Sequence, residues 1–374
     1  MIRINNRERA NAILHYRDYD RMPVVHFGYW RETLRKWADE GHLTREEADR
    51  WGDGNRTDDV IAQKLGFDFG WGATLGQHTS LMPSFETKVI RDLGGGRRHV
   101  QNGDGVTVLE SDGAVSIQAE ISHLLVDRRS WEEHYLPRMR FSEERVNYEA
   151  IGRHKNTAYA DRPTGLHIGS LYGTLRNWIG MEGLSYLQYD DEELYREIID
   201  TMGNLCYEVT KRTLDTGVTF DFAHFWEDIC FNSGPLVSPA VFAEKIGPHY
   251  RRITSLLMEH GVDIVSLDCD GCIDALVPVW LENGVNTMFP IEVGTWNASI
   301  APWREKYGPD IRGIGGMNKT VFARDYAAVD AEIERLKPLV ALGGYIPCPD
   351  HRIAPDAKWE NVQYYTQEMR KAFG

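Results

Sequence analysis

VDIVSLDCDGCIDALVPVWLENGVNTMFPI, residues 262–291, contains two short apolar runs separated by a longer amphipathic stretch. The runs at 262–268 and 285–291 have the length and composition of buried strands, and the stretch at 273–282 has helical periodicity. A strand, a helix and a second strand in this order predict a parallel βαβ unit.

The same alternation recurs through most of the 374 residues. Further strands are predicted at 22–27, 67–71, 164–169, 219–225, 311–315 and 341–346, and further helices at 190–214, 238–260, 321–336 and 358–372. Eight units fit a (β/α)8 barrel better than a doubly wound sheet, and no glycine-rich dinucleotide fingerprint follows the first strand. The fold class predicted is therefore α/β, with a single TIM barrel over residues 1–374.

One segment, residues 86–126, departs from this rhythm. Its apolar residues recur with a period near two, and glycine-containing turn signals lie at 94–96, 102–105 and 112–113. This pattern predicts antiparallel β-hairpins inserted into the barrel after its second strand.

Composition and charge restrict the possible partners. The chain has 42 Lys+Arg against 56 Asp+Glu, a formal charge of −14, which disfavours a broad nucleic-acid surface or an anionic membrane. It contains no apolar run of membrane-spanning length, and its polar N-terminus does not resemble a secretory signal. The five cysteines are an odd number and too few for a disulfide scaffold, so we expect a cytoplasmic protein. Because nucleic acid and membrane are disfavoured, we expect it to act on a small molecule.

In a barrel, reactive groups lie at the C-terminal ends of the strands. Polar and aromatic residues follow most of the predicted strands, although polar caps at strand ends are an equally simple explanation for any one of them. Aromatic members would form the wall of a substrate site, and Glu227 with Asp228 would orient the substrate. The substrate-binding residues predicted in this way are His26, Tyr29, Trp30, Tyr172, Trp226, Glu227, Asp228, Glu292, Asn318 and Lys319.

The candidate catalytic residues are Asp268, Asp270 and His351. Alternate residues of a strand share a face, so Asp268 and Asp270 would point the same way. Two adjacent carboxylates are tolerated with a cation between them, a shared proton or wide solvent access. With His351 they form a mixed oxygen and nitrogen set that suits a divalent metal, zinc or a harder ion. A sulfur-rich zinc site is the alternative, and it would use Cys269, Cys272, Cys348 and His351.

Several motifs resemble the uroporphyrinogen decarboxylase superfamily, which also contains cobalamin-dependent methyltransferases. The likeness extends over nearly the whole chain, and the resemblance implies a (β/α)8 barrel. The motifs are NRER (6–9), DRMPV (20–24), LYG (171–173), WED (226–228), GGMNK (315–319) and GGYIP (343–347) leading into DHRIAP (350–355).

Departures from the superfamily patterns indicate the subfamily. True decarboxylases carry an Arg-Gln-Ala-Gly-Arg stretch after strand 1, whereas residues 27–32 here read FGYWRE. This difference and the charge of −14 disfavour a porphyrinogen with eight carboxylates. The zinc methyltransferases bind zinc through a His-x-Cys after strand 5 and a Cys after strand 8. These positions resemble Asp268, Asp270 and His351, so the resemblance implies oxygen in place of sulfur ligands and a methylated alcohol, phenol ether or amine.

The function expected from the sequence is transfer of a methyl group between a small O-, N- or S-methyl substrate and a corrinoid carried by a partner protein. Two alternatives remain open. One is a metal-free decarboxylase or lyase of a small carboxylic acid, in which His351 and a protonated Asp donate protons. The other is a binding barrel without catalytic activity.

Overall fold

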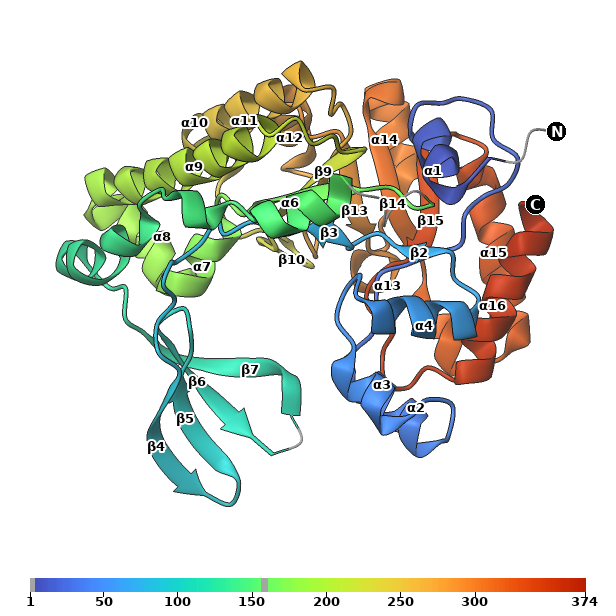
Figure 1. Ribbon diagram of the computed structural model, residues 1–374, viewed down its shortest axis with the longest axis horizontal. Coiled ribbons are helices and arrows are strands. Elements are labelled where there is room, and N and C mark those ends of the chain that lie inside the picture. Colours follow the sequence, from blue (N-terminus) through green and yellow to red (C-terminus); the bar gives the residue numbers. More distant parts are fainter. Residues whose placement is uncertain (1–3, 113, 156–160) are drawn as a thin grey trace.

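The central element of the fold is a sheet of parallel strands, seen in a computed structural model that describes residues 4–112, 114–155 and 161–374 (Figure 1). In these residues the sheet has seven strands, and most neighbours in the sheet are also successive βα units of the chain. The strands, in spatial order, are β15 (Tyr345–Pro349), β14 (Arg312–Met317), β13 (Thr287–Ile291), β12 (Val265–Asp268), β9 (Phe222–Trp226), β8 (Gly165–Gly169) and β3 (Thr74–Leu75).

Two further strands complete the ring in part. β1 (Val25–His26) pairs in parallel with β2 (Phe69–Gly70), so the second barrel strand is split: β2 pairs with β1, and β3 pairs with β8. On the other side, the Trp30 N–H donates to Ile353 O (3.2 Å) and the Ile353 N–H donates to Gly28 O (3.0 Å). The arrangement is TIM-barrel-like, but no continuous hydrogen-bonded ladder closes it within the described ranges.

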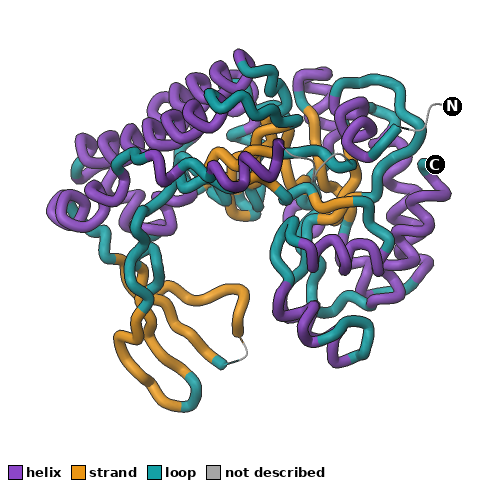
Figure 2. The backbone as a smooth tube through the Cα atoms, viewed as in Figure 1, coloured by secondary structure: helices purple, strands orange, loops and turns teal. Residues whose placement is uncertain are grey.

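Helices surround the central strands (Figure 2). The longest described helix, α9, agrees with the helix predicted at 190–214. The helices are α1 (Asn6–Leu14), α2 (Arg31–Asp39), α3 (Arg45–Arg50), α4 (Arg56–Leu65), α5 (Arg128–Ser130), α6 (Tyr148–Lys155), α7 (Gly173–Ile179), α8 (Met181–Asp190), α9 (Glu192–Leu214), α10 (Pro239–Lys245), α11 (Gly247–Glu259), α12 (Val277–Glu282), α13 (Val293–Trp296), α14 (Ile300–Tyr307), α15 (Tyr326–Val340) and α16 (Trp359–Ala372).

Several predicted boundaries differ from the observed ones, and two of the differences have clear local reasons. The single helix predicted at 238–260 is divided into α10 and α11 at Ile246, because Pro248 lacks an N–H and starts a new helix. The last strand begins at Tyr345 rather than 341, because Gly343 and Gly344 have φ values of 68° and 57°. Such left-handed backbone forms a turn and cannot continue a strand.

A small antiparallel sheet projects from the rest of the molecule (Figure 1). Its strands, joined in sequence order, are β4 (Lys88–Gly94), β5 (Arg97–Gln101), β6 (Val106–Ser111) and β7 (Ala114–His123). These strands, which we call the arm, lie within the segment 86–126 where hairpins were predicted, and they follow β2 and β3. Gly113, part of one predicted turn, lies outside the described residues.

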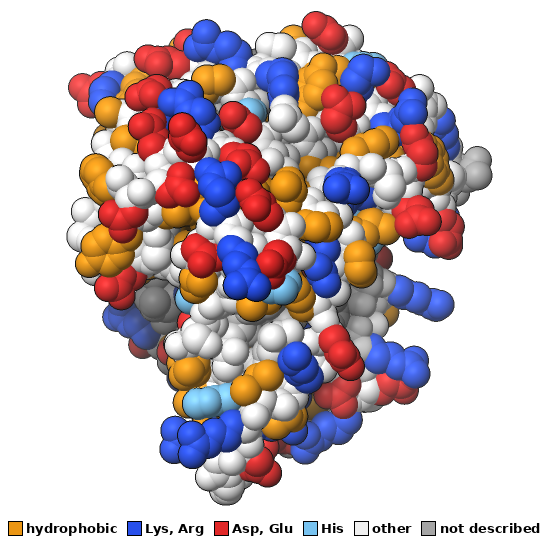
Figure 3. All heavy atoms as spheres, turned by 90° about the vertical axis from the view of Figure 1, so that its left-hand side faces the viewer, with side chains coloured by type: hydrophobic (Ala, Val, Ile, Leu, Met, Phe, Trp, Pro, Cys, Tyr) orange, Lys and Arg blue, Asp and Glu red, His pale blue; other side chains and the backbone are white. Residues whose placement is uncertain are grey.

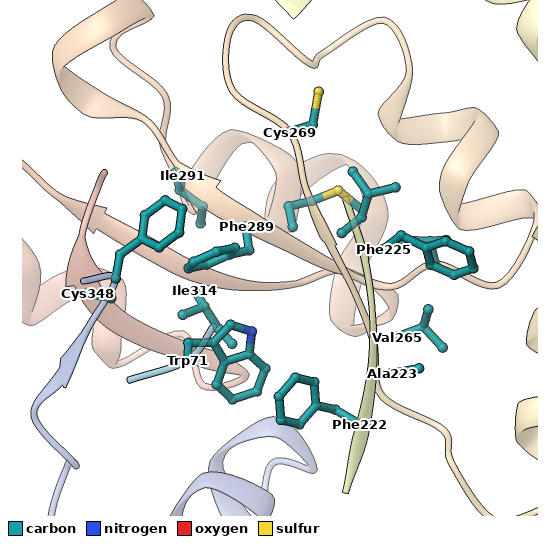
Figure 4. Close-up of a cluster of buried hydrophobic side chains, with 14 of the residues drawn as sticks. Trp71, Phe222, Ala223, Phe225, Val265, Cys269, Phe289, Ile291, Ile314 and Cys348 are labelled. Atoms are coloured by element: carbon teal, nitrogen blue, oxygen red, sulfur yellow. The ribbon is translucent and has the colours of Figure 1, made fainter. Parts of the chain in front are cut away.

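The core lies between the strands and the helices and also fills the barrel interior. Trp71 stacks on Phe222 with ring centroids 4.2 Å apart, and these rings lie beside Phe289 and Ile314 (Figure 4). On the outside, acidic and basic side chains are interspersed over the face that Figure 3 draws. Of the described helices, none combines the length and apolarity that a membrane span requires.

Candidate active site

Chemically reactive side chains converge at the edge formed by the C-terminal ends of the central strands, which we call the mouth. His351 follows β15, and Asp270 follows β12. His351 Nε2 lies 3.2 Å from Asp270 Oδ2, and both side chains are partly buried. Trp30 stacks on the imidazole with ring centroids 5.5 Å apart, and Phe27 contacts it edge-on at 5.6 Å. The two rings fix the orientation of the imidazole.

Asp270 is held by a constrained loop. Gly271 has φ +88°, and a Cβ at this position would lie 2.5 Å from the Cys230 carbonyl oxygen, so only glycine fits. The Gly271 N–H donates to Glu292 Oε2 at 2.5 Å. Within the described residues, Asp270 Oδ1 and His351 Nδ1 are buried atoms that have no hydrogen-bond partner. One acceptor and one imidazole nitrogen of the pair are therefore buried without a hydrogen-bond partner among the described residues.

Three more carboxyl groups surround Asp270. Burial raises the pKa of Asp228 and Glu292, and the charge of Asp270 raises both further. Burial raises the pKa of Asp268 well above its ordinary value, and repulsion from Asp270 and Asp228 adds to this. All three shifts favour the neutral form of these carboxyl groups relative to an exposed acid.

Cationic side chains balance part of this charge. Arg176 lies 3.8 Å from Asp228 Oδ2, and Arg352 forms a two-point ion pair with Asp53 at 2.9 and 2.7 Å. Burial lowers the pKa of Lys319, although the nearby Asp350 opposes this effect. Sequence reasoning missed Arg176 and Arg352 as parts of the site. The sequence could have indicated both arginines, because Arg352 directly follows His351 and Arg176 lies in the first turns after the LYG motif (171–173).

Glu227 is buried and has a structural role. Its side chain is fully buried, and it accepts hydrogen bonds from the N–H groups of Leu171 (2.8 Å), Tyr172 (2.9 Å) and Gly173 (2.7 Å). Ser170 Oγ and the Tyr250 hydroxyl also donate to it. Glu227 thus fixes the loop after β8, while the next residue, Asp228, adopts φ 53° and joins the carboxyl cluster.

Other predicted binding residues lie in the core. His26 and Tyr29 are each only 1% exposed and stack on each other at 5.3 Å, and Gly28 donates to His26 Nδ1. Tyr172 is buried, and its hydroxyl accepts a 2.9 Å hydrogen bond from Tyr195. The structure does not bring these three side chains to the His351–Asp270 pair.

The remaining predicted residues line or support the mouth. Trp226 is the strand partner of Asp268, on the edge where the carboxyl groups gather. Glu292 joins that cluster, and Thr295 donates to its Oε1. Asn318 caps the short helix Lys319–Ala323 by accepting the Thr320 N–H at 3.1 Å, and the Lys319 N–H donates to Asp350.

The donor atoms do not fit the predicted metal. No group of three His, Cys, Asp or Glu side chains in the described part of the chain is arranged to hold a metal ion. His351 Nε2, one of its two possible ligand atoms, instead faces Asp270. The sulfur-rich alternative has the same difficulty, since Cys269 and Cys348 are buried in the hydrophobic core.

No protein-family model matches the sequence, and no curated protein matches it significantly. Among solved structures, the chain is similar to a methyltransferase from Methanosarcina mazei, with a TM-score of 0.60 and 14% identity over 98% of this chain and 99% of that one. It also matches a Listeria monocytogenes protein assigned as a vitamin-B12-independent methionine synthase, with a TM-score of 0.43 and 12% identity over 95% of this chain and 100% of that one. The first likeness shows a shared overall fold.

Proposed function

We propose that this protein is a methyltransferase that demethylates a small neutral or cationic O-, N- or S-methyl compound, with His351 as the proton donor to the departing heteroatom. The observation that carries the proposal is the His351–Asp270 pair. The His351 Nε2 is engaged by the Asp270 carboxylate, and the His351 Nδ1 has no hydrogen-bond partner among the described residues. This arrangement suits a general acid, because one nitrogen is oriented and the other is not used by the described protein groups.

The proposed step balances as follows. The bond between the methyl carbon and the heteroatom breaks, and its electron pair stays on the heteroatom. The heteroatom takes the proton from His351 Nδ1, while the methyl group passes to a nucleophilic acceptor. Asp270 accepts the Nε2–H and stabilises the imidazolium before transfer.

The charge at the mouth supports a neutral or cationic substrate. Four carboxyl groups lie together, those of Asp228, Asp268, Asp270 and Glu292, and the raised pKa of three of them supports a site that disfavours an additional negative charge. A substrate carboxylate would meet the same repulsion. For this reason we place decarboxylation of a small acid second, and porphyrinogen decarboxylation below it.

Methyl transfer is preferred to other acid-catalysed reactions because the full-length fold is one on which a methyltransferase is built. The resemblance of several sequence motifs to the uroporphyrinogen decarboxylase superfamily, which no family model confirms, favours the same assignment and a corrinoid acceptor. That corrinoid, held by a partner protein, would supply the nucleophile that takes the methyl group. The proposed step is written without a metal, because the described residues contain no group of three side chains arranged to hold one.

The test uses the purified chain with free cob(I)alamin as acceptor and methanol, guaiacol or trimethylamine as donor. Formation of methylcobalamin, followed by its absorbance, is expected with at least one donor and is expected to be lost in His351→Asn. Carbon dioxide release from 4-hydroxybenzoate, without methylation of cobalamin by any donor, would contradict the proposal and support the lyase.

A further inference from the structure

Within the described residues, separate contacts rather than a continuous ladder join the segment 27–33, which follows the start of β1, to the segment 351–353 after β15. We call this junction the seam. Besides the two backbone hydrogen bonds described above, Thr33 Oγ1 donates to Ile353 O at 2.7 Å. His351 lies on the seam, two residues before Ile353. The position of its imidazole therefore depends on the contacts that join the two segments.

An ion pair ties a third segment to the seam. Arg352 donates to Asp53 through both of its Nη atoms, at 2.9 and 2.7 Å, and Asp53 lies in the loop between α3 and α4. The guanidinium also lies over two aromatic rings, with its Cζ 5.5 Å from the centroid of Phe27 and 5.4 Å from that of Trp51. A planar fork that is bound at two points and contacts two rings has a defined orientation.

The backbone of the seam leaves room for this ion pair at Gly28. A Cβ at that position would lie 2.8 Å from Arg352 Nη1 and 3.0 Å from Asp53 Oδ1, so a side chain there would displace the pair. Gly28 also has φ +92°, a conformation that favours glycine. The close approach of the guanidinium to the segment after β1 therefore depends on a residue without a side chain.

Phe27 connects the ion pair to the imidazole. Its ring contacts His351 edge-on at 5.6 Å, and the guanidinium of Arg352 lies over the same ring. Because His351 and Arg352 are successive residues, an anchored guanidinium also restricts the peptide that joins them. The direction of His351 Nε2 toward Asp270, at 3.2 Å, therefore depends on a side chain that does not contact either atom of that pair.

We propose that Arg352 and Asp53 are positioning residues for His351, and that they act through Phe27 and the seam rather than on the substrate. Their side chains are 30% and 41% exposed, and ion pairs with this exposure contribute little to stability. The pair therefore matters more for the direction of the imidazole than for the stability of the fold. The effect on orientation does not depend on the proposed function, whereas the effect on turnover rests on it.

The experiment compares Asp53→Asn with Asp20→Asn in the purified full-length protein. Asp20 is a matched control because Arg9 binds it at two points, both at 2.7 Å, ahead of β1. We expect Asp53→Asn to shift the His351 ring signals in a ¹H–¹⁵N spectrum and to lower kcat by about 10- to 100-fold with little change in KM. The signals are assigned by their loss in His351→Asn. Asp20→Asn should lower the midpoint of urea unfolding but leave the His351 signals in place.

Arg352→Lys is a second variant, which keeps the positive charge and removes the planar fork. It should shift the His351 signals as Asp53→Asn does. His351 signals that stay in place in either variant would overturn the proposal. A loss of stability in Asp53→Asn as large as that in Asp20→Asn would also overturn it, because the pair would then brace the fold. The spectra and the unfolding curves require no methyl transfer, so they remain decisive if the proposed function is wrong.

Discussion

His351 Nε2 lies 3.2 Å from Asp270 Oδ2, although the two residues belong to loops that follow different strands, β15 and β12. The barrel-like order of the strands brings these loops to one edge. The carboxylate therefore selects which imidazole nitrogen faces a reactant.

Replacing Asp270 by Asn should impair proton donation while leaving the binding surface nearly unchanged. Because general acid catalysis contributes about 10²–10⁴-fold, we expect kcat to fall by a factor in this range with little change in KM. Steady-state kinetics would measure both constants, with whichever of the three candidate donors methylates cobalamin. Asp274→Asn is the control, since Asp274 accepts the Trp303 indole N–H at 2.6 Å outside the mouth. Equal losses in the two variants would contradict the role of Asp270.

Replacing Asp268 by Asn should stabilise the fold at neutral pH. The pKa of Asp268 in the folded protein is raised above the ordinary 3.8. The contribution of Asp268 to stability is therefore fully present below pH 3.8 and is lost as the pH rises through the folded-state pKa. We expect a gain on the order of 1 kcal/mol at pH 7 in urea unfolding, fading toward zero at low pH.

Asp20→Asn is the control for that pH profile, because the pKa of Asp20 is shifted in the opposite direction to that of Asp268. The hydrogen bond from Arg9 lowers the Asp20 pKa to about 2, so its contribution is present above the ordinary value and is lost as pH falls through about 2. Asp20→Asn should therefore destabilise the fold at pH 7. If Asp268→Asn also lowered the free energy of unfolding, the repulsion inferred at the mouth would be wrong.

Glu227→Gln should destabilise the fold because an amide nitrogen would face backbone N–H donors in a buried site. We expect a loss of about 1–3 kcal/mol in the free energy of unfolding. Glu197→Gln provides the comparison, since Glu197 accepts from Trp131 and Arg128 but is 38% exposed, and about 1 kcal/mol or less is expected there. A Glu227 variant as stable as the wild type but defective in substrate binding would restore the direct role predicted from the sequence.

Gly271→Ala tests the close approach that positions Asp270. Gly261→Ala is matched to it, because both glycines have positive φ, +88° and +78°, but Gly261 has open space around it. We expect Gly271→Ala to cost more stability and to shift the His351 ring signals, whereas Gly261→Ala should leave them in place. Equal costs, with unchanged signals in both, would show that the contact with Cys230 does not hold the turn.

Removal of metal gives a further test. Because His351 Nε2 faces Asp270 and no three side chains of the described residues are arranged to hold a metal ion, we expect dialysis against a chelator to leave the His351 signals and the methyl transfer unchanged. Elemental analysis of the native protein is the companion measurement. Stoichiometric zinc together with loss of transfer after dialysis would restore the metal centre predicted from the sequence.

The fold was predictable where a pattern is local. Strand β12 and the strands around it follow from short apolar runs, and α9 follows from its helical periodicity. The division at Pro248 and the turn at Gly343 also had sequence signals, which an extended periodic pattern obscured. The splitting of the second strand into β2 and β3 had none, because it depends on which neighbour each segment pairs with.

The site was predictable as a set of strand ends but not as a set of contacts. Asp270 and His351 were correctly expected to lie near each other, since both follow strands of one sheet. Tyr172 has the same kind of position in the sequence, yet it is buried beside Tyr195, because the direction of a side chain depends on packing that no spacing encodes. Arg352 was missed since its ion pair with Asp53 joins distant segments.

The arm bears on how the chain reaches its fold. β3 and β8 are neighbours in the sheet, although the arm and α6 separate them in sequence. Closing so long a loop costs entropy that grows with its length, whereas every ladder in the arm joins consecutive strands, which favours early formation. A preformed arm shortens the effective loop, so its hairpins should accelerate pairing of the barrel strands even if they never touch the substrate.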